Sequence, residues 1–345
     1  MEQAYGTPGR GPKSGPGPSA TCQAGGMTSG ITDVPGVRVA HVTLSQDAPV
    51  VRTGVTCVLP HHRDLLAHPV PAAVHVVNGY GKPVGLSQVV ELGELEAPVL
   101  LTGTLAVGAV HEGAVRELLG RHPDLGRPAT VNPVVLECND GRLHDARTLA
   151  VRPAHAEAAV RAARTAGEGH PVEQGAVGAG TGMVAFGWKG GIGTASVPVQ
   201  DDDGVRATLG ALVLTNMGRP EDLVVHGRRV GARGGEPVAG PADGSVVVLL
   251  ATDAPFDARQ LGRLARRGQN GLARTGVPTA HGSGEFVLAW STGSTTDAPR
   301  RDGGWLTPWF DAVAEVVEEA VLSSLRHARA TTGLGGLVAD RCPHV

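Results

Sequence analysis

The junction at Gly244 and Ser245, where a glycine- and proline-rich segment meets an apolar run, most constrains what this chain can fold into. Residues 234–244 contain closely spaced glycines and prolines, which sustain neither a helix nor a central strand, so we expect an exposed loop there. Residues 246–251 read VVVLLA, an uninterrupted apolar run that is typical of a strand buried on both faces. Ser245 is therefore expected at the first position of a core strand, directly after a glycine.

This arrangement suits self-cleavage of the chain between Gly244 and Ser245. The serine hydroxyl can attack the carbonyl of Gly244, because glycine has no Cβ to hinder the attack and tolerates a strained backbone. The product begins with Ser245, whose new α-amino group has a pKa of roughly 7.7–8 and can act as the base for its own hydroxyl. The same two residues also occur at an ordinary loop-to-strand junction, so further residues are needed to decide between the two interpretations.

Length and composition favour a large folded core and exclude several classes of protein. A chain of 345 residues that is 41% hydrophobic but only 3% aromatic must build its core from Val, Leu and Ala packed around Gly. The net charge of −3 provides no field for binding nucleic acid or an anionic membrane. No apolar run approaches the roughly 18 residues of a membrane-spanning helix. The four cysteines lie far apart without a CxxC pair, which indicates neither a disulfide framework nor a zinc ribbon.

The chain is expected to divide into a leader, residues 1–28, and a single domain, residues 29–345. The leader is rich in Gly, Pro, Ser and Thr and has no continuous apolar segment, so we expect it to be disordered and the protein to be cytoplasmic. Cleavage before Ser245 would process the domain into a large chain, residues 29–244, and a small chain, residues 245–345.

Apolar periodicity predicts interspersed strands and helices. Strands are expected over residues 37–44, 53–59, 72–77, 130–137, 209–215, 246–251 and 285–291. Helices are expected over residues 107–119, 154–166 and 256–275, and from residue 307 onward. We expect Asp253 to cap the helix after the Ser245 strand, with Pro255 in its first turn. Stacked layers of strands and helices are the natural outcome of this order.

Several familiar motifs are incomplete in this chain. The dense glycines of residues 175–194 invite a dinucleotide-binding interpretation, but residues 183–188 are expected to be strand where that motif needs a helix, so tight turns with close packing are favoured. His111 and Glu112 are followed by Val115 where a zinc-binding helix needs a second histidine. The 14 histidines show no cluster with ligand spacing, and we predict neither a metal nor a cofactor.

Four side chains away from the junction remain as catalytic candidates. Ser283 and Glu285 are two residues apart at the entrance to a strand, so both project from one face and can orient an amine or a hydroxyl. Asn216 follows a buried strand, where its amide can donate to an oxyanion. Lys189 lies among glycines beside Trp188, a context in which desolvation can lower the pKa of its amine. A solvated glutamate, a turn asparagine and a surface lysine are the ordinary interpretations of the same residues.

Residues 244–255, with residues 260–267 and 271–275 behind them, resemble the L-aminopeptidase/D-esterase (DmpA) family of self-processing serine aminopeptidases, which includes β-peptidyl aminopeptidases. The resemblance extends from residue 31 to about residue 335. It includes ITDVPGVRVAHV at 31–42, NGYGKPVGL at 78–86, LTGTLAVG at 101–108 and KGGIG at 189–193. Several long blocks in the same order make the resemblance specific.

The resemblance implies an α+β fold, a four-layer αββα sandwich of the Ntn-hydrolase type. Its two fragments are implied to stay together and to assemble as homotetramers or larger, without a metal or cofactor. It implies that Ser245 is the nucleophile exposed by cleavage after Gly244, that Ser283 and Glu285 lie beside it, and that Asn216 is the oxyanion donor. Lys189 matches a lysine implicated in relatives that use threonine as the nucleophile.

Residues 137–145, ECNDGRLHD, correspond to a pocket-lining block in which many relatives carry an aromatic residue. We expect Glu137 and Asn139 to contact the substrate, whereas Cys138 and Arg142 leave the specificity for the acyl group open. His281 stands where many members of the family have asparagine.

We therefore predict a self-cleaving N-terminal-nucleophile hydrolase, an aminopeptidase that cuts the amide or ester bond after the N-terminal residue of short peptides through an acyl-enzyme on Ser245. One alternative is an amidohydrolase of the same family acting on a pantetheine-type or ω-amino-acid amide. A minor alternative is a non-catalytic ligand-binding protein that uses the glycines of residues 178–193. Small peptides, amides or esters are the expected partners; nucleic acid and membrane are not.

Overall fold

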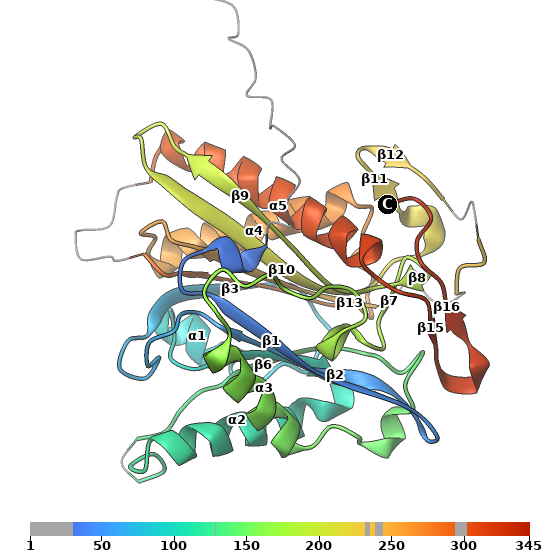
Figure 1. The fold of residues 1–345 in the computed structure, drawn as a ribbon. Helices are drawn as coiled ribbons and strands as arrows, with labels where there is room; N and C mark the ends of the chain where they lie inside the picture. Colours follow the sequence, from blue (N-terminus) through green and yellow to red (C-terminus); the bar gives the residue numbers. More distant parts are fainter. Residues whose placement is uncertain (1–29, 128, 232–234, 239–243, 294–301) are drawn as a thin grey trace, which may run out of the picture.

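Two main sheets and five α-helices make up most of the structure (Figure 1). The computed structural model describes residues 30–345 except 128, 232–234, 239–243 and 294–301, so the predicted leader lies outside the described residues. The four-stranded sheet has the order β1-β2-β5-β6, formed by Arg38–Asp47, Val50–Leu59, Val99–Gly103 and Val134–Cys138. The six-stranded sheet has the order β4-β3-β14-β13-β10-β9, formed by Glu94–Leu95, Val70–Gly79, Gly284–Ser291, Ser245–Thr252, Arg206–Asn216 and Gly191–Gln200.

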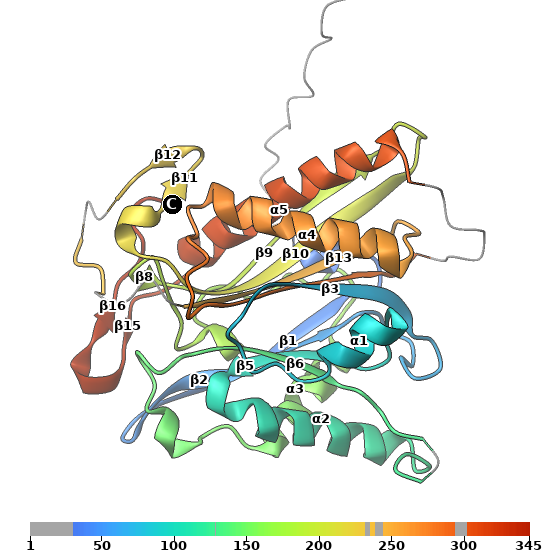
Figure 2. The ribbon, with the colours of Figure 1, turned by 180° about the vertical axis from the view of Figure 1, so that it is seen from behind.

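The described residues form the helices α1 (Leu86–Leu92), α2 (Val107–Arg121), α3 (Pro153–Thr165), α4 (Ala258–Arg274) and α5 (Thr307–Arg326). The four helices α2 to α5 cover the outer faces of the two sheets (Figures 1 and 2). The short α1 lies against β3 and β4 instead, with Val89 in the core between the sheets. α4 and α5 pack on the six-stranded sheet, whereas α2 and α3 pack on the four-stranded sheet. Three short hairpins lie outside the sheets: β7 and β8 (Val184–Ala185, Trp188–Lys189), β11 and β12 (Val224–Val225, Arg228–Arg229), and β15 and β16 (Thr331–Thr332, Val338–Ala339).

Separate apolar cores fill the three spaces between the layers. One core joins α4 and α5 to the six-stranded sheet, the second lies between the two sheets, and the third joins α2 and α3 to the four-stranded sheet. This arrangement is the four-layer αββα sandwich that the family resemblance implied.

β13 lies inside the six-stranded sheet and explains why residues 246–251 are apolar without alternation. It pairs parallel with β14 and antiparallel with β10, and all eight of its residues are buried. Val246 faces the helix-side core, whereas Val247 faces the core between the sheets. Both faces of the strand therefore contact apolar side chains, as the sequence predicted.

The predicted start of the helix after β13 was wrong. α4 begins at Ala258, and Asp257 caps it: its carboxylate accepts from the backbone N–H of Gln260 at 2.6 Å, while the Gln260 side chain accepts from the N–H of Asp257 at 3.2 Å. Asp253 instead accepts from the N–H of Thr208 on β10 at 2.7 Å. A capping box therefore fixes the start of the helix four residues beyond the predicted cap.

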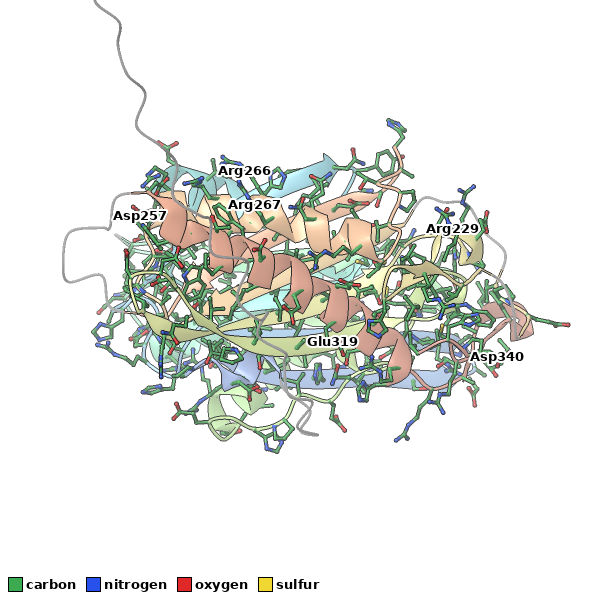
Figure 3. All side chains as sticks on the ribbon, turned by 90° about the horizontal axis from the view of Figure 1, so that it is seen from above. Arg229, Asp257, Arg266, Arg267, Glu319 and Asp340 are labelled. Carbon is green, nitrogen blue, oxygen red and sulfur yellow. The ribbon has the colours of Figure 1, made fainter. Side chains whose placement is uncertain are left out.

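α4 carries a buried apolar face and an arginine-rich outer face. Leu261, Leu264 and Leu272 are buried against the sheet. Arg266 and Arg267 lie on the outer side of the helix layer in Figure 3. No helix in the described part of the chain combines the length and the apolar character needed to cross a bilayer.

The glycine-dense residues 175–194 form tight turns and not a nucleotide-binding loop. A Cβ at Gly191 would overlap the carbonyl of Gly175, and a Cβ at Gly193 would overlap the carbonyl of Ala320 in α5. The short strands β7 and β8 lie within this segment, and β9 begins at its end. Close packing therefore explains the glycines, as the sequence favoured.

Candidate active site

Strand ends from both sheets meet around a cavity of about 580 Å³ at one end of the sandwich. Ser245 is the first residue of β13 and Asn216 is the last residue of β10, whereas Glu137 reaches the cavity from β6 of the other sheet. The lining residues are Tyr80, Lys82, Thr104, Glu137, Asn139, Gly141, Arg142, Asn216, Gly244, Ser245, His281 and Gly282. The fold therefore brings together five of the predicted site residues, which span more than a hundred positions of the chain, from Glu137 to Ser245.

Ser245 pairs with Gly284, the first residue of β14, and the serine residue is 7% exposed. Its Oγ accepts from the backbone N–H of Gly284 at 3.3 Å. Gly244 packs directly on the end of β10, because a Cβ there would overlap the carbonyl oxygen of Asn216 and lie 2.6 Å from Met217 Cα. Only glycine fits at the residue before the serine.

Ser283 and Glu285 form a buried hydrogen-bonded pair but do not line the cavity. Ser283 Oγ donates to one carboxylate oxygen of Glu285 at 2.8 Å, and Thr279 Oγ1 donates to the other at 2.9 Å. Burial raises the pKa of Glu285, and the two hydroxyl donors oppose that shift. Glu285 is in register with Val246, one residue beyond Ser245, so strand alternation directs its side chain to the other face of the sheet from the Ser245 hydroxyl.

Asn216 is held at both ends of its side-chain amide. Its Oδ1 accepts from the N–H of Val184 at 3.0 Å, and its Nδ2 donates to the carbonyl of Asn139 at 2.9 Å. A primary amide carries two N–H groups on Nδ2, so one donor is used to orient the side chain and a second serves the cavity that Asn216 lines.

Lys189 is completely buried and is connected to Asn216 through one backbone peptide group. Its Nζ donates at 2.7–2.9 Å to three backbone carbonyls, those of Gly180, Met183 and Gly190. Burial lowers the pKa of Lys189 from 10.5 to about 7. The carbonyl of Met183 belongs to the same peptide group as the Val184 N–H that holds Asn216. The predicted desolvation of Lys189 is confirmed, but the residue does not line the cavity.

Glu137 presents a buried carboxylate to the cavity. One of its oxygens accepts from the backbone N–H of Lys82 at 2.8 Å, and the other accepts from the Thr104 hydroxyl. A carboxylate that lines a cavity and accepts only from two neutral donors keeps its negative charge and can hold a cation there.

The neighbours of Glu137 play different parts. The backbone carbonyl of Asn139 accepts from Asn216, and its side chain accepts from the N–H of Gly141 at 3.0 Å. The Cys138 thiol points away from the cavity toward the carbonyl of Leu214, and burial raises its pKa. Of the two residues that left specificity open, Arg142 therefore lines the cavity and Cys138 does not.

The loop after β3 supplies residues that our sequence reasoning did not assign to the site. The Tyr80 ring lies 5.8 Å from the His281 ring, and Lys82 Nζ lies 4.7 Å from the centre of the Tyr80 ring. These side chains form one rim of the cavity. The turn chemistry of residues 78–83 was the available signal, although it did not show which strand ends would meet the loop.

Among the described residues, no group of three or more His, Cys, Asp or Glu side chains is placed to hold a metal ion.

The model of peptidase family S58 matches residues 29–339, nearly the whole of the described chain. The chain belongs to this family. A β-peptidyl aminopeptidase, BapA of Sphingosinicella microcystinivorans, is 37% identical to this S58 peptidase over 92% of this chain and 86% of its own length.

Solved structures agree with that assignment. The PH0078 protein of Pyrococcus horikoshii OT3 has a TM-score of 0.82 and 42% identity, over 91% of each chain. The L-aminopeptidase D-ala-esterase/amidase of Ochrobactrum anthropi, described as a prototype of the serine aminopeptidases with a variant of the Ntn hydrolase fold, has a TM-score of 0.80 and 34% identity, over 93% of each chain. The predicted family, the Ntn-hydrolase-like α+β fold and the hydrolytic aminopeptidase class are confirmed.

Proposed function

We propose that this S58 peptidase matures by cleaving itself between Gly244 and Ser245, giving chains of residues 29–244 and 245–345. Ser245 then acts as an N-terminal nucleophile on short peptides, amides or esters. The proposal rests on one observation above all: the hydroxyl at the start of β13 opens into the same cavity as Asn216 and Glu137. The glycine requirement at position 244 supports the cleavage site, because the bond to be cut lies where no side chain hinders attack.

In the mature enzyme, Ser245 Oγ attacks the scissile carbonyl of the substrate and its own α-amino group accepts the hydroxyl proton. The free Nδ2 donor of Asn216 stabilises the negative charge that develops on the carbonyl oxygen. Lys189 is a positioning residue, which holds the peptide group that orients Asn216. The amine leaves, and water hydrolyses the acyl-enzyme.

Ser283 and Glu285 act on the amine of Ser245 and not on its hydroxyl. In the uncleaved chain the Gly244 carbonyl faces β14, and cleavage turns the Ser245 nitrogen into an amine that can rotate toward β14, whereas the Ser245 hydroxyl faces away from Glu285. The buried pair thus orients the new N-terminus and sets its proton affinity.

Glu137 is proposed to hold the ammonium group of the substrate, with Asn139 shaping the adjoining wall through its backbone. The named activity of the relative BapA leads us to include N-terminal β-amino acids beside α-amino acids as residues released. An amidohydrolase acting on ω-amino-acid or pantetheine-type amides uses the same nucleophile, and comparison of alanyl with β-alanyl p-nitroanilides separates these substrate classes.

Assembly and compartment form part of the same proposal. From the resemblance to the self-processing aminopeptidases we propose a homotetramer or larger, which size-exclusion chromatography with light scattering measures. Cys57, Cys138 and Cys342 are buried and unpaired, which fits a reducing compartment such as the cytoplasm.

Denaturing mass spectrometry of the wild type beside Ser245→Ala tests the proposal. We expect the wild type to give two masses, with a new N-terminus at Ser245, and to hydrolyse aminoacyl p-nitroanilides. Ser245→Ala is expected to remain one chain without activity. Normal processing and full activity of Ser245→Ala would contradict the assignment of the nucleophile.

A further inference from the structure

The peptide group between Ser283 and Gly284 touches both reacting atoms of the proposed self-cleavage. Its N–H, on Gly284, lies 3.2 Å from the carbonyl oxygen of Gly244 and 3.3 Å from Ser245 Oγ. The carbonyl oxygen becomes negatively charged when the hydroxyl attacks the carbonyl carbon. A donor that already faces this oxygen stabilises the charge without reorganising during the reaction.

The other end of the same peptide group is held by Asn78, at the end of β3. Asn78 Nδ2 lies 2.5 Å from the carbonyl oxygen of Ser283, 2.9 Å from that of His281 and 3.2 Å from that of Ala280. A hydrogen bond accepted at the C=O of a peptide group polarises it and strengthens the donor at its N–H. Asn78 thus fixes the turn that enters β14 and strengthens the donor that faces Gly244.

Close approach of three glycines makes this geometry possible. A Cβ at Gly284 would lie 2.9 Å from Gly81 Cα and 3.3 Å from Ser245 Oγ, and a Cβ at Gly244 would overlap the carbonyl of Asn216. Side chains at these positions would separate the β3 loop, the β14 entrance and the scissile bond. The three segments meet at backbone distance around the bond to be cut.

We propose that the Gly284 N–H is the oxyanion donor of self-cleavage and that Asn78 is its positioning residue. This inference rests on the proposed function. Ser245 Oγ bonds to the carbonyl carbon of Gly244 while the Gly284 N–H stabilises the oxyanion. The C–N bond between Gly244 and Ser245 then breaks, the hydroxyl proton passes to the leaving nitrogen, and residue 244 is held as an ester. Water hydrolyses the ester, so the Gly244 carboxyl group and the Ser245 hydroxyl are released.

Replacing the Gly284 amide by an ester tests the donor directly. The full chain is made by cell-free translation with glycolic acid at position 284, which replaces only the N–H by oxygen, and the conversion of precursor into fragments is followed by pulse and chase. We expect cleavage to slow about a hundredfold, the usual loss for one oxyanion donor. The matched control carries lactic acid at Ala289, further along β14, and is expected to cleave at the rate of the wild type. Wild-type cleavage by the 284 ester, or equal slowing by both esters, would overturn the inference.

Asn78→Asp tests the positioning residue, with Asn132→Asp as its control because Asn132 similarly donates to a loop carbonyl, that of Gly85, at 2.9 Å. We expect Asn78→Asp to slow cleavage about tenfold near pH 8, as the loss of one good hydrogen bond does. A protonated carboxyl donates again, so the ratio of variant to wild-type rate should recover as the pH is lowered toward 4, near the ordinary aspartate pKa of about 3.9. Glu285, in register with Asn78 on β14, and His281 in the turn are titratable neighbours of this position in both proteins, so only the difference between the two pH profiles is assigned to the substitution.

These results separate the inference from the proposed function. If the wild type does not cleave, both fail. If the wild type cleaves and Ser245→Ala does not, self-cleavage stands; the donor assignment then falls if the 284 ester cleaves at the wild-type rate, and the role of Asn78 falls if Asn78→Asp matches the wild type at every pH. Resistance to added protease shows that each variant is folded. If the 284 ester is digested, the pH profile of cleavage by Asn78→Asp decides whether the inference stands.

Discussion

At the scale of single residues, the site depends on backbone peptide groups that buried polar side chains hold from behind. Lys189 holds the peptide group whose N–H orients Asn216, and Asn78 holds the peptide group whose N–H faces Gly244. In both cases a side chain that does not line the cavity fixes a residue paired with Ser245 in the sheet, Asn216 in one case and Gly284 in the other. Such residues affect the reaction through geometry, so their loss should change stability and rate together.

Lys189→Met is expected to lower the free energy of unfolding by about 2 kcal/mol at pH 7, because three buried carbonyls lose their donor. Burial lowers the pKa of Lys189 from 10.5 to about 7, so the unfolded chain binds the proton more readily than the folded chain in that interval. The unfolding free energy of the wild type relative to Lys189→Met should therefore rise from pH 7 toward pH 10. Urea denaturation at several pH values measures both effects. Lys82→Met, at an exposed lysine, serves as the control. If the unfolding free energy of the wild type relative to Lys189→Met fell as the pH rose, the lowered pKa of Lys189 would be contradicted.

Glu137→Gln is expected to raise KM for aminoacyl p-nitroanilides about tenfold with a smaller change in kcat, because the substrate ammonium loses a charged acceptor while the neutral hydrogen bonds around residue 137 are retained. Steady-state kinetics with alanyl p-nitroanilide measures the effect. A propionyl ester, which lacks the amine, should be hydrolysed equally well by both proteins. An equal loss on both substrates would show that Glu137 does not bind the amine.

At the scale of elements, α4 shows how a helix start depends on one capping box. Asp257→Ala is expected to lower the free energy of unfolding by about 1 kcal/mol, because the first turn loses the acceptor for the Gln260 N–H. Glu91→Ala, at an exposed position on α1, should change it by no more than about 0.5 kcal/mol. Urea denaturation of the two variants compares them. Equal effects would mean that the cap contributes nothing to stability.

β13, α4 and α1 also show how far the sequence pattern alone predicts secondary structure. The apolar run of β13 predicted a strand, because burial on both faces makes every residue apolar. The spacing of Leu261, Leu264 and Leu272 predicted a helix, because burial on one face repeats apolar residues every three or four positions. The helix start was misplaced because Asp253 and Asp257 are equally plausible caps, and only the contact of Asp253 with β10 distinguishes them. The seven-residue α1, between Gly85 and Gly93, is too short to show a period and was not predicted.

The candidate site was predictable in its residue types more than in its connections. A carboxylate and a hydroxyl two positions apart indicated the Ser283–Glu285 pair. Asn78 lies about two hundred residues from the turn that it holds, and no local pattern records that β3 ends beside the entrance to β14. Long-range strand order, and not local propensity, decides such contacts.

At the scale of the whole molecule, the proposed cleavage would divide the sandwich without separating it. The small chain would contain β13 and β14 together with α4 and α5, and the large chain would contain the neighbouring strands β3 and β10. β13 pairs with β10, and β14 pairs with β3, so each new chain is hydrogen-bonded to the other along two strands. The helix-side core likewise contains residues from both chains.

We expect the two mature chains to elute together from size-exclusion chromatography under native conditions, and to separate only in denaturant. The reason is that removal of residues 245–345 would take the two inner strands out of a six-stranded sheet and expose the apolar face between the sheets to water. Native and denaturing mass spectrometry of one sample measure the association. The small chain expressed alone should be insoluble or unfolded, because both of its strands would lack a partner on one side. Dissociation of the chains in native buffer, or independent folding of either chain, would show that the two parts are separate domains and not one interleaved sandwich.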